Sequence, residues 1–122
     1  MDKDKSVSFE LAKPFLGKEV EVVIDRPLGS RHPKYPDEIY EINSGFISGV
    51  IAPDGKELDA HYLGLDKPVE KARGVVIAII HRLEDDDDKL VVVPKGMVLT
   101  DGEIEEKVYF QEKYFKHTIV RK

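Results

Sequence analysis

The chain has 122 residues, a formal net charge of −5 at pH 7 and no cysteine. These values favour a single globular domain, residues 1–122, and exclude disulfides and thiolate metal sites. No apolar run approaches the roughly 18 residues needed to span a bilayer, and the negative charge argues against general affinity for nucleic acid or anionic membranes. We therefore expect a cytoplasmic protein whose partner is a small molecule, with no nucleic acid and no membrane.

The N-terminal segment predicts little regular structure before the first strand. Residues 1–5 are expected to fray, and residues 9–15 predict one helical turn broken by Pro14. Residues 19–25 are rich in β-branched side chains, which favours a core strand.

A basic loop follows this strand. Residues 28–36 contain glycine, serine and two prolines, and they hold Arg31, His32 and Lys34 within four positions. Three nitrogen donors in one loop can grip a phosphate, although an ordinary solvated loop has the same composition. Residues 38–42 then predict a further short strand.

The centre of the chain predicts a hairpin that carries two aspartates. Residues 45–51, with a kink at Gly49, and residues 58–63 predict its strands, and Ala-Pro-Asp-Gly forms the turn between them. Asp54 lies in the turn and Asp59 just inside the returning strand, so both carboxylates can converge on a hard cation such as Mg²⁺. Asp-Gly also occurs in hairpin turns for backbone reasons alone.

The next strands are predicted on either side of an acidic run. Residues 74–83 are the most apolar stretch and predict a buried central strand, and residues 90–93 predict its partner. The five acidic residues 84–88 must form the connection, either as a solvated tip or neutralised by a bound cation. His61 and His81 fall in apolar strands, where packed and hydrogen-bonded histidines are expected rather than metal ligands.

The C-terminal region predicts the one extended helix. Thr100-Asp-Gly-Glu103 is a capping-box pattern, and Ile104 and Val108 follow on one helical face, with Tyr114 expected in the core. Residues 118–120 predict a final edge strand. The predicted fold class is α+β, a small closed β-barrel, OB-like, of about six or seven strands with one C-terminal helix packed on it.

The order of these features resembles the family I soluble inorganic pyrophosphatases over residues 19–116. DGKELDA (54–60) resembles the family's triple-aspartate signature, and DDKLVVVP (87–94) resembles the segment that supplies a metal-binding aspartate and a substrate-binding lysine. VVIDRPLGSRHPKY and YEINSGFI resemble the basic loop and the tyrosine-rich segment upstream of the signature.

The resemblance implies a Mg²⁺-dependent inorganic pyrophosphatase that cleaves diphosphate to two phosphates with metal-activated water. It also makes a homo-oligomer the candidate assembly. It implies metal ligation by Asp54, Asp59, Asp87 and Asp25, catalytic roles for Asp54, Asp59 and Lys89, and substrate binding by Lys34, Tyr40, Lys56, Lys89 and Tyr114. These residue types suit the hydrolysis of a Mg²⁺-bound diphosphate, because carboxylates bind the cation and lysines balance the remaining charge of the phosphates.

The sequence departs from the family at several positions. Lys56 replaces the middle aspartate of the signature, which in the family helps to activate the attacking water; Pro36, Ser44 and Phe115 replace an acidic residue, a tyrosine and a lysine. A second hypothesis is therefore a catalytically degenerate domain that binds a phosphate-containing ligand or hydrolyses a different phosphoanhydride. A third, a small barrel for single-stranded nucleic acid, fits the negative charge poorly.

Overall fold

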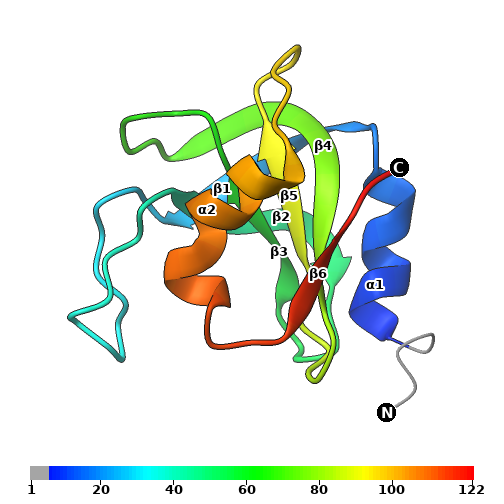
Figure 1. The fold of residues 1–122 in the computed structure, drawn as a ribbon, viewed down its shortest axis with the longest axis horizontal. Helices are drawn as coiled ribbons and strands as arrows, with labels where there is room; N and C mark the ends of the chain where they lie inside the picture. The colour runs from blue at the N-terminus through cyan, green and yellow to red at the C-terminus, as the bar shows by residue number, and fades with distance from the viewer. Residues whose placement is uncertain (1–5) are drawn as a thin grey trace.

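A six-stranded sheet, with five strands closed into a barrel, dominates the computed structural model (Figure 1). The structure describes residues 6–122, so the expected fraying of residues 1–5 lies outside it. The elements are α1 (Val7–Ala12), the 3₁₀-helix η2 (Lys13–Phe15), β1 (Glu19–Arg26), β2 (Asn43–Ile51), β3 (Glu57–Tyr62), β4 (Lys71–Arg82), β5 (Lys89–Val93), α2 (Asp101–Glu112) and β6 (His117–Val120).

The long strand β4 closes the barrel. The strands follow the order β1-β2-β3-β5-β4, and β4 pairs back with β1 through residues 71–75 while its later residues pair with β5 and β6. All of these pairings are antiparallel except the one between β3 and β5. The α+β small-barrel prediction is thus confirmed, with β6 as an extra strand at the edge.

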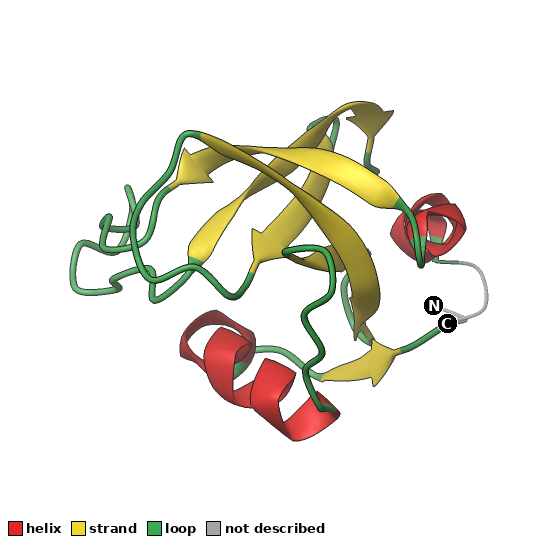
Figure 2. Cartoon of the chain, turned by 90° about the horizontal axis from the view of Figure 1, so that it is seen from above, coloured by secondary structure: helices red, strands yellow, loops and turns green. Residues whose placement is uncertain are grey.

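The barrel wall separates two apolar clusters. Alternate residues of β3, Leu58, Ala60 and Tyr62, face the barrel interior, whereas Leu63 belongs to the outer cluster that α2 covers. Strand β5 is buried on both faces because Leu90 and Val92 point inward while neighbouring residues point to α2, which explains its unbroken apolar sequence. Figure 2 shows α2 lying along the outside of the sheet, with α1 at a separate end.

The outer face of the barrel is apolar over most of its length and polar at one end. Ile104 and Val108 of α2 pack on apolar strand residues, while Asp59 and His61 alternate with the inward-facing residues of β3 and so lie on this same outer side. The outer face of the barrel therefore carries apolar packing under most of α2 and a row of polar side chains near the end of α2.

Several local predictions are confirmed. Thr100 caps α2 through a complete capping box with Glu103, and Gly49 adopts a φ of 88° where the β2–β3 register shifts. His61 and His81 are buried and hydrogen-bonded, as expected.

Two predictions are wrong. Residues 38–42 form no barrel strand, because their backbone bonds return to the preceding loop, as in the bonds from Tyr40 N to Ser30 O and from His32 N to Glu38 O. Tyr114 is not a core residue: α2 ends at Glu112, so the helical face does not extend to Tyr114, which is 67% exposed.

The acidic run is not simply a solvated tip, because Asp85, Asp86 and Asp88 accept hydrogen bonds from within the chain. Asp86 accepts hydrogen bonds from Ser6 Oγ, from Val7 N and from both Ser8 N and Ser8 Oγ, at 2.6–3.0 Å. Burial works to raise the pKa of Asp86, but these bonds outweigh it and lower the pKa. Asp86 therefore anchors the start of α1 on the β4–β5 connection.

Among residues 6–122, the helices are all too short or too polar to cross a membrane.

Candidate active site

Seven of the nine predicted site residues line one cavity of about 260 Å³, here called the carboxylate cavity. They come from the end of β1, the loop before β2, the β2–β3 turn, β3 and the start of β5. The seven are Asp25, Tyr40, Asp54, Lys56, Asp59, Asp87 and Lys89, and Arg26, Ser44, Gly45, Ala60, His61 and Gln111 complete the lining. Four carboxylates against three cationic side chains leave one net negative charge when His61 is neutral.

Lys89 organises the inner end of this cavity. The parallel register pairs Ala60 with Leu90, which places the preceding residues Asp59 and Lys89 side by side. Lys89 Nζ lies 2.7 Å from Asp59 Oδ2 and 3.3 Å from Asp87 Oδ2, although the Lys89 residue is only 6% exposed. Desolvation works to lower the pKa of Lys89, but attraction to Asp59 and Asp87 prevails and raises it, so the ammonium stays charged.

Burial also acts on Asp59. It raises the pKa of this carboxyl, even though the neighbouring Lys89 opposes the shift. The Asp59–Lys89 pair is thus a half-buried ion pair whose carboxylate still borders the cavity.

Residues of the β2–β3 turn line the outer end of the cavity. Asp54 Oδ1 accepts a hydrogen bond from Lys56 N at 2.9 Å, the bond of an Asx-turn, and Gly55 takes a φ of 83°. Both side chains are exposed, so the turn has a backbone role and still presents a carboxylate and an ammonium at the mouth of the cavity.

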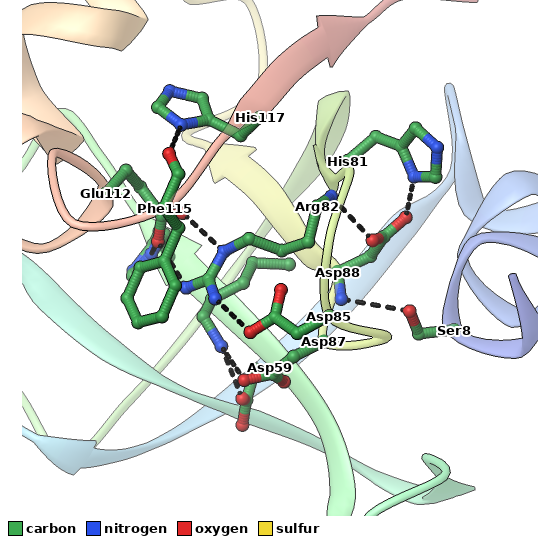
Figure 3. A network of polar contacts seen from close by, with 12 residues as sticks. Ser8, Asp59, His81, Arg82, Asp85, Asp87, Asp88, Glu112, Phe115 and His117 are labelled. Carbon is green, nitrogen blue, oxygen red and sulfur yellow. Dashed lines mark hydrogen bonds and ion pairs between the residues drawn. The ribbon is translucent and has the colours of Figure 1, made fainter. Parts of the chain in front are cut away.

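A buried charge network lies beside the cavity, between the outer face of the barrel and the end of α2 (Figure 3). Arg82 Nε and Nη2 donate to Glu112 at 2.7 and 3.1 Å, and Arg82 Nη1 donates to Asp85 at 2.9 Å. The guanidinium also stacks 3.8 Å from the Phe115 ring centroid. Burial would raise the pKa of Glu112, but hydrogen bonds from His61 and Arg82 lower it to about 2.

His61 joins the charge network to the cavity. His61 Nε2 lies 3.4 Å from Glu112 Oε2, and its Nδ1 lies 2.8 Å from Ser44 Oγ. The antiparallel register of β2 and β3 pairs Ser44 directly with His61, and Gly45 permits the close approach of β1, since a Cβ there would collide with the Val23 carbonyl oxygen.

The two remaining predicted residues, Lys34 and Tyr114, line a second cavity of about 950 Å³, here called the aromatic cavity. It lies between the basic loop and the end of α2, and Gln111 lines both cavities. The other lining residues are His32, Tyr35, Pro36, Asp37, Glu38, Ile39, Glu41, Phe110, Gln111, Lys113 and Phe115. The structure therefore places Lys34 and Tyr114 in a different cavity from the predicted catalytic aspartates, and the two cavities share Gln111 in their linings.

The carboxylate cavity offers hard oxygen donors but no assembled cage for a metal ion. Across residues 6–122, no three acidic, histidine or cysteine side chains are grouped closely enough to hold an ion. Lys89 accounts for this in part, because it pairs with both Asp59 and Asp87. Mg²⁺ retains several waters and is commonly held by one or two carboxylates together with substrate phosphates, so these donors fit a cation that arrives with an anionic ligand.

Sequence reasoning missed Ser44, His61, Gln111, Arg82 and Glu112 as neighbours of this cavity. The alternation of β3 carried a usable pattern, because Asp59 and His61 are two residues apart and so share a face. No sequence pattern indicates that Gln111 and Glu112 of α2 lie near this cavity, since their position depends on how the helix packs on the barrel.

Solved structures of bacterial inorganic pyrophosphatases are similar to this chain. The one from Neisseria gonorrhoeae is 25% identical, with a TM-score of 0.59 over 80% of this chain and 74% of that chain. The one from Ehrlichia chaffeensis is 18% identical, with a TM-score of 0.62 over 84% of each chain, and the one from Helicobacter pylori is 17% identical, with a TM-score of 0.61 over 85% of each chain. No family model and no curated protein sequence matches the chain.

The chain thus has the fold of the family I soluble inorganic pyrophosphatases. The resemblance expected from the aspartate-containing segments is confirmed at the level of the fold.

Proposed function

We propose that this protein is an inorganic pyrophosphatase-type hydrolase that acts in the carboxylate cavity with Mg²⁺. The observation that carries the proposal is the convergence of seven predicted residues from separate segments on one cavity, within a pyrophosphatase fold. The expected substrate is pyrophosphate and the expected products are two phosphates.

The cationic side chains have a direct task in this reaction. Lys89, Lys56 and Arg26 border the cavity and would bind phosphate oxygens, which stabilises the charge that builds up as the P–O bond breaks. Lys89 is already charged and held between Asp59 and Asp87, so it requires little rearrangement when substrate binds.

The carboxylates have the complementary task. Asp54, Asp59, Asp87 and Asp25 would hold Mg²⁺ that enters with the substrate. A bound Mg²⁺ neutralises phosphate charge and lowers the pKa of a coordinated water. Without such a cation, the net negative charge of the cavity would repel pyrophosphate.

Binding measurements test this division of tasks. Titration calorimetry with Mg²⁺ and pyrophosphate should show weaker binding to Asp54→Ala and Asp59→Ala, with Asp66→Ala, an exposed aspartate outside the cavity, as the matched control. Unchanged affinity for both ligands in both cavity variants would overturn the proposal.

A larger phosphoanhydride is the second candidate substrate, and one observation favours it. Gln111 lines both cavities, and its Oε1 is buried without a hydrogen-bond partner among the described residues. A nucleoside diphosphate would place its phosphates in the carboxylate cavity and stack its base on an aromatic side chain such as Tyr114, a contact that contributes about 1–3 kcal/mol. Tyr114→Ala should then weaken turnover of the nucleotide but not of pyrophosphate, and Tyr109→Ala, on the exposed side of α2, should change neither.

The degenerate binding domain remains the alternative to both enzymes. It predicts pyrophosphate binding without phosphate release, and activity restored by Lys56→Asp, which returns an aspartate to the signature. Calorimetry run beside the activity assay separates these outcomes.

A further inference from the structure

The aromatic cavity has the size and lining of a small-molecule site, and hydrolysis of pyrophosphate alone makes no use of it. Its volume is about 950 Å³, against about 260 Å³ for the carboxylate cavity. Ligand pockets commonly measure about 300–1,000 Å³ and are lined by aromatic side chains with a few polar groups. The basic loop that forms one wall projects from the barrel (Figure 1), and the end of α2 forms the other. The aromatic cavity therefore suits a ligand group larger than a phosphate.

A series of ring contacts connects the two cavities. Tyr35 packs on His32 with ring centroids 5.1 Å apart, and His32 stacks on Tyr40 at 6.2 Å with the ring planes 7° apart. Tyr40 meets the Phe110 ring edge-on at 5.6 Å. Tyr40 lines the carboxylate cavity, the other three rings line the aromatic cavity, and Gln111 lines both. Because the cavities share this border, one ligand can occupy both.

Two exposed tyrosines give the aromatic cavity surfaces on which a flat ring can stack. Tyr35 lies on the basic loop and Tyr114 lies beyond the end of α2, and both side chains are exposed. Aromatic side chains stabilise most when their faces are covered, and stacking on such faces is a principal source of affinity for nucleobases. A base that binds here would extend the series of rings that ends at Tyr40.

The charged groups of the aromatic cavity indicate which part of a ligand it accepts. The carboxylates of Asp37, Glu38 and Glu41 outnumber the ammonium groups of Lys34 and Lys113. This lining has no surplus of cations to hold a phosphate, whereas carboxylates accept hydrogen bonds from amino groups. The aromatic cavity therefore suits a neutral ring with an amino group, and the phosphates of the same ligand belong in the carboxylate cavity.

We propose that the aromatic cavity is a nucleobase site, with Tyr35 as its main stacking residue, and that the substrates include a nucleoside diphosphate whose base carries an exocyclic amino group, such as adenosine diphosphate. The inference rests on the proposed function, which places the diphosphate in the carboxylate cavity, and it keeps direct attack by water. It adds the chemical class of the base and the residue that selects it.

The reaction of the larger substrate balances in the same way as that of pyrophosphate. Water adds to the terminal phosphorus, the bridging P–O bond breaks, and adenosine monophosphate leaves with the bridging oxygen. The products are adenosine monophosphate, phosphate and a proton, and no oxidant or reductant is needed. Binding of the base, remote from the reacting phosphorus, supplies interaction energy that pyrophosphate lacks.

Calorimetry with two probes that resist hydrolysis tests the nucleobase site without any need for activity. Methylenediphosphonate and adenosine 5′-(α,β-methylene)diphosphate both carry a P–C–P group, and only the second carries a base. With Mg²⁺ present, Tyr35→Ala should lower the affinity for the adenosine probe relative to methylenediphosphonate by about tenfold, because a stacking face is lost. Tyr109→Ala, an exposed tyrosine of α2 that lines neither cavity, should keep the wild-type ratio.

The outcomes separate this inference from the proposed function. If wild type binds methylenediphosphonate and Tyr35→Ala leaves the ratio unchanged, the nucleobase site is overturned and the diphosphate site stands. If only the adenosine probe binds, and more weakly to Tyr35→Ala, the nucleobase site is supported and pyrophosphate is overturned as a substrate. If neither probe binds to wild type, both proposals are overturned.

Shifts of backbone amide resonances locate the base in the wild-type protein. Adenosine alone should shift amides within residues 32–41 and 110–115, which line the aromatic cavity, and their absence or a response confined to other segments would overturn the site. Inosine, in which an oxygen replaces the exocyclic amino group, should bind about threefold more weakly. Equal affinity for the two nucleosides would overturn the assignment of an amino-bearing base.

Discussion

Two groups of charges lie next to each other on the outer face of the barrel, and they differ in how completely the chain satisfies them. Arg82, Glu112 and Asp85 form a network in which the guanidinium and Glu112 are almost fully buried and bonded to each other. In the carboxylate cavity, Asp59 and Asp87 are each 38% exposed at the side chain and Asp54 lies at the surface. A saturated network fixes structure, whereas carboxylates that still face a cavity can bind a ligand.

The largest expected effect on stability is the loss of Arg82. Arg82→Met would leave Glu112 buried without its main partner, so the free energy of unfolding should fall by about 3–5 kcal/mol. Arg73→Met is the matched control, because its ion pair with Glu19 is 62% and 47% exposed and should contribute less than about 1 kcal/mol. Urea unfolding measures both, and equal losses would contradict the distinction between buried and exposed pairs.

The dependence of stability on pH should also distinguish the buried network from the carboxylate cavity. Because the folded-state pKa of Glu112 lies at about 2, below its ordinary value of 4.5, the unfolded chain binds this proton more readily. The stability that Glu112 contributes is fully present above about pH 4.5 and is lost as the pH falls towards about 2. Burial raises the pKa values of Asp59 and Asp88, which act in the opposite direction.

A variant isolates the Glu112 contribution from those of the other carboxyls. The free energy of unfolding of Glu112→Gln should fall less steeply with acid between about pH 4.5 and 2 than that of wild type. Parallel curves for the two proteins would show that Glu112 does not have a lowered pKa.

A change at the cavity mouth should alter ligand binding more than stability. Lys56→Asp converts an exposed ammonium to a carboxylate next to Asp54, so Mg²⁺ affinity should rise by about tenfold, equivalent to about 1.4 kcal/mol. Unfolding should change by less than about 0.5 kcal/mol, as for most surface substitutions. Calorimetry and urea unfolding check the two effects, and unchanged Mg²⁺ affinity would place the cation elsewhere.

The smallest expected effect lies at the start of α2, away from both cavities. Thr100→Ala removes the side chain that accepts from Glu103 N at 3.1 Å and should cost about 1 kcal/mol of stability. Phosphate release should stay at the wild-type rate, because Thr100 lines neither cavity. A fall in activity without a fall in stability would link α2 docking to catalysis.

Local patterns in the sequence were sufficient for most of the barrel. β-Branched runs and turn residues predicted β1 and β5, and the capping box predicted the start of α2. The prediction of a strand at residues 38–42 was wrong, because this segment makes its backbone hydrogen bonds with the preceding loop and not with a barrel strand. The amino-acid composition of the segment does not show which of these two partners its backbone will bind.

The candidate site was predictable only where neighbouring strands set it. Asp54 and Asp59 follow from one hairpin, and the resemblance supplied Asp87 and Lys89. The proximity of Glu112 to His61, and of Asp86 to Ser8, joins positions 51 and 78 residues apart and depends on helix docking. Such long-range polar contacts have no periodicity in the sequence.

The most direct test of the central claim is phosphate release from pyrophosphate by the purified protein with Mg²⁺, with EDTA as the blank. Hydrolysis in the carboxylate cavity predicts metal-dependent release that falls by at least about 100-fold in Asp54→Ala and is unchanged in Asp66→Ala. No release by the wild-type protein, or equal release by Asp54→Ala, would contradict it.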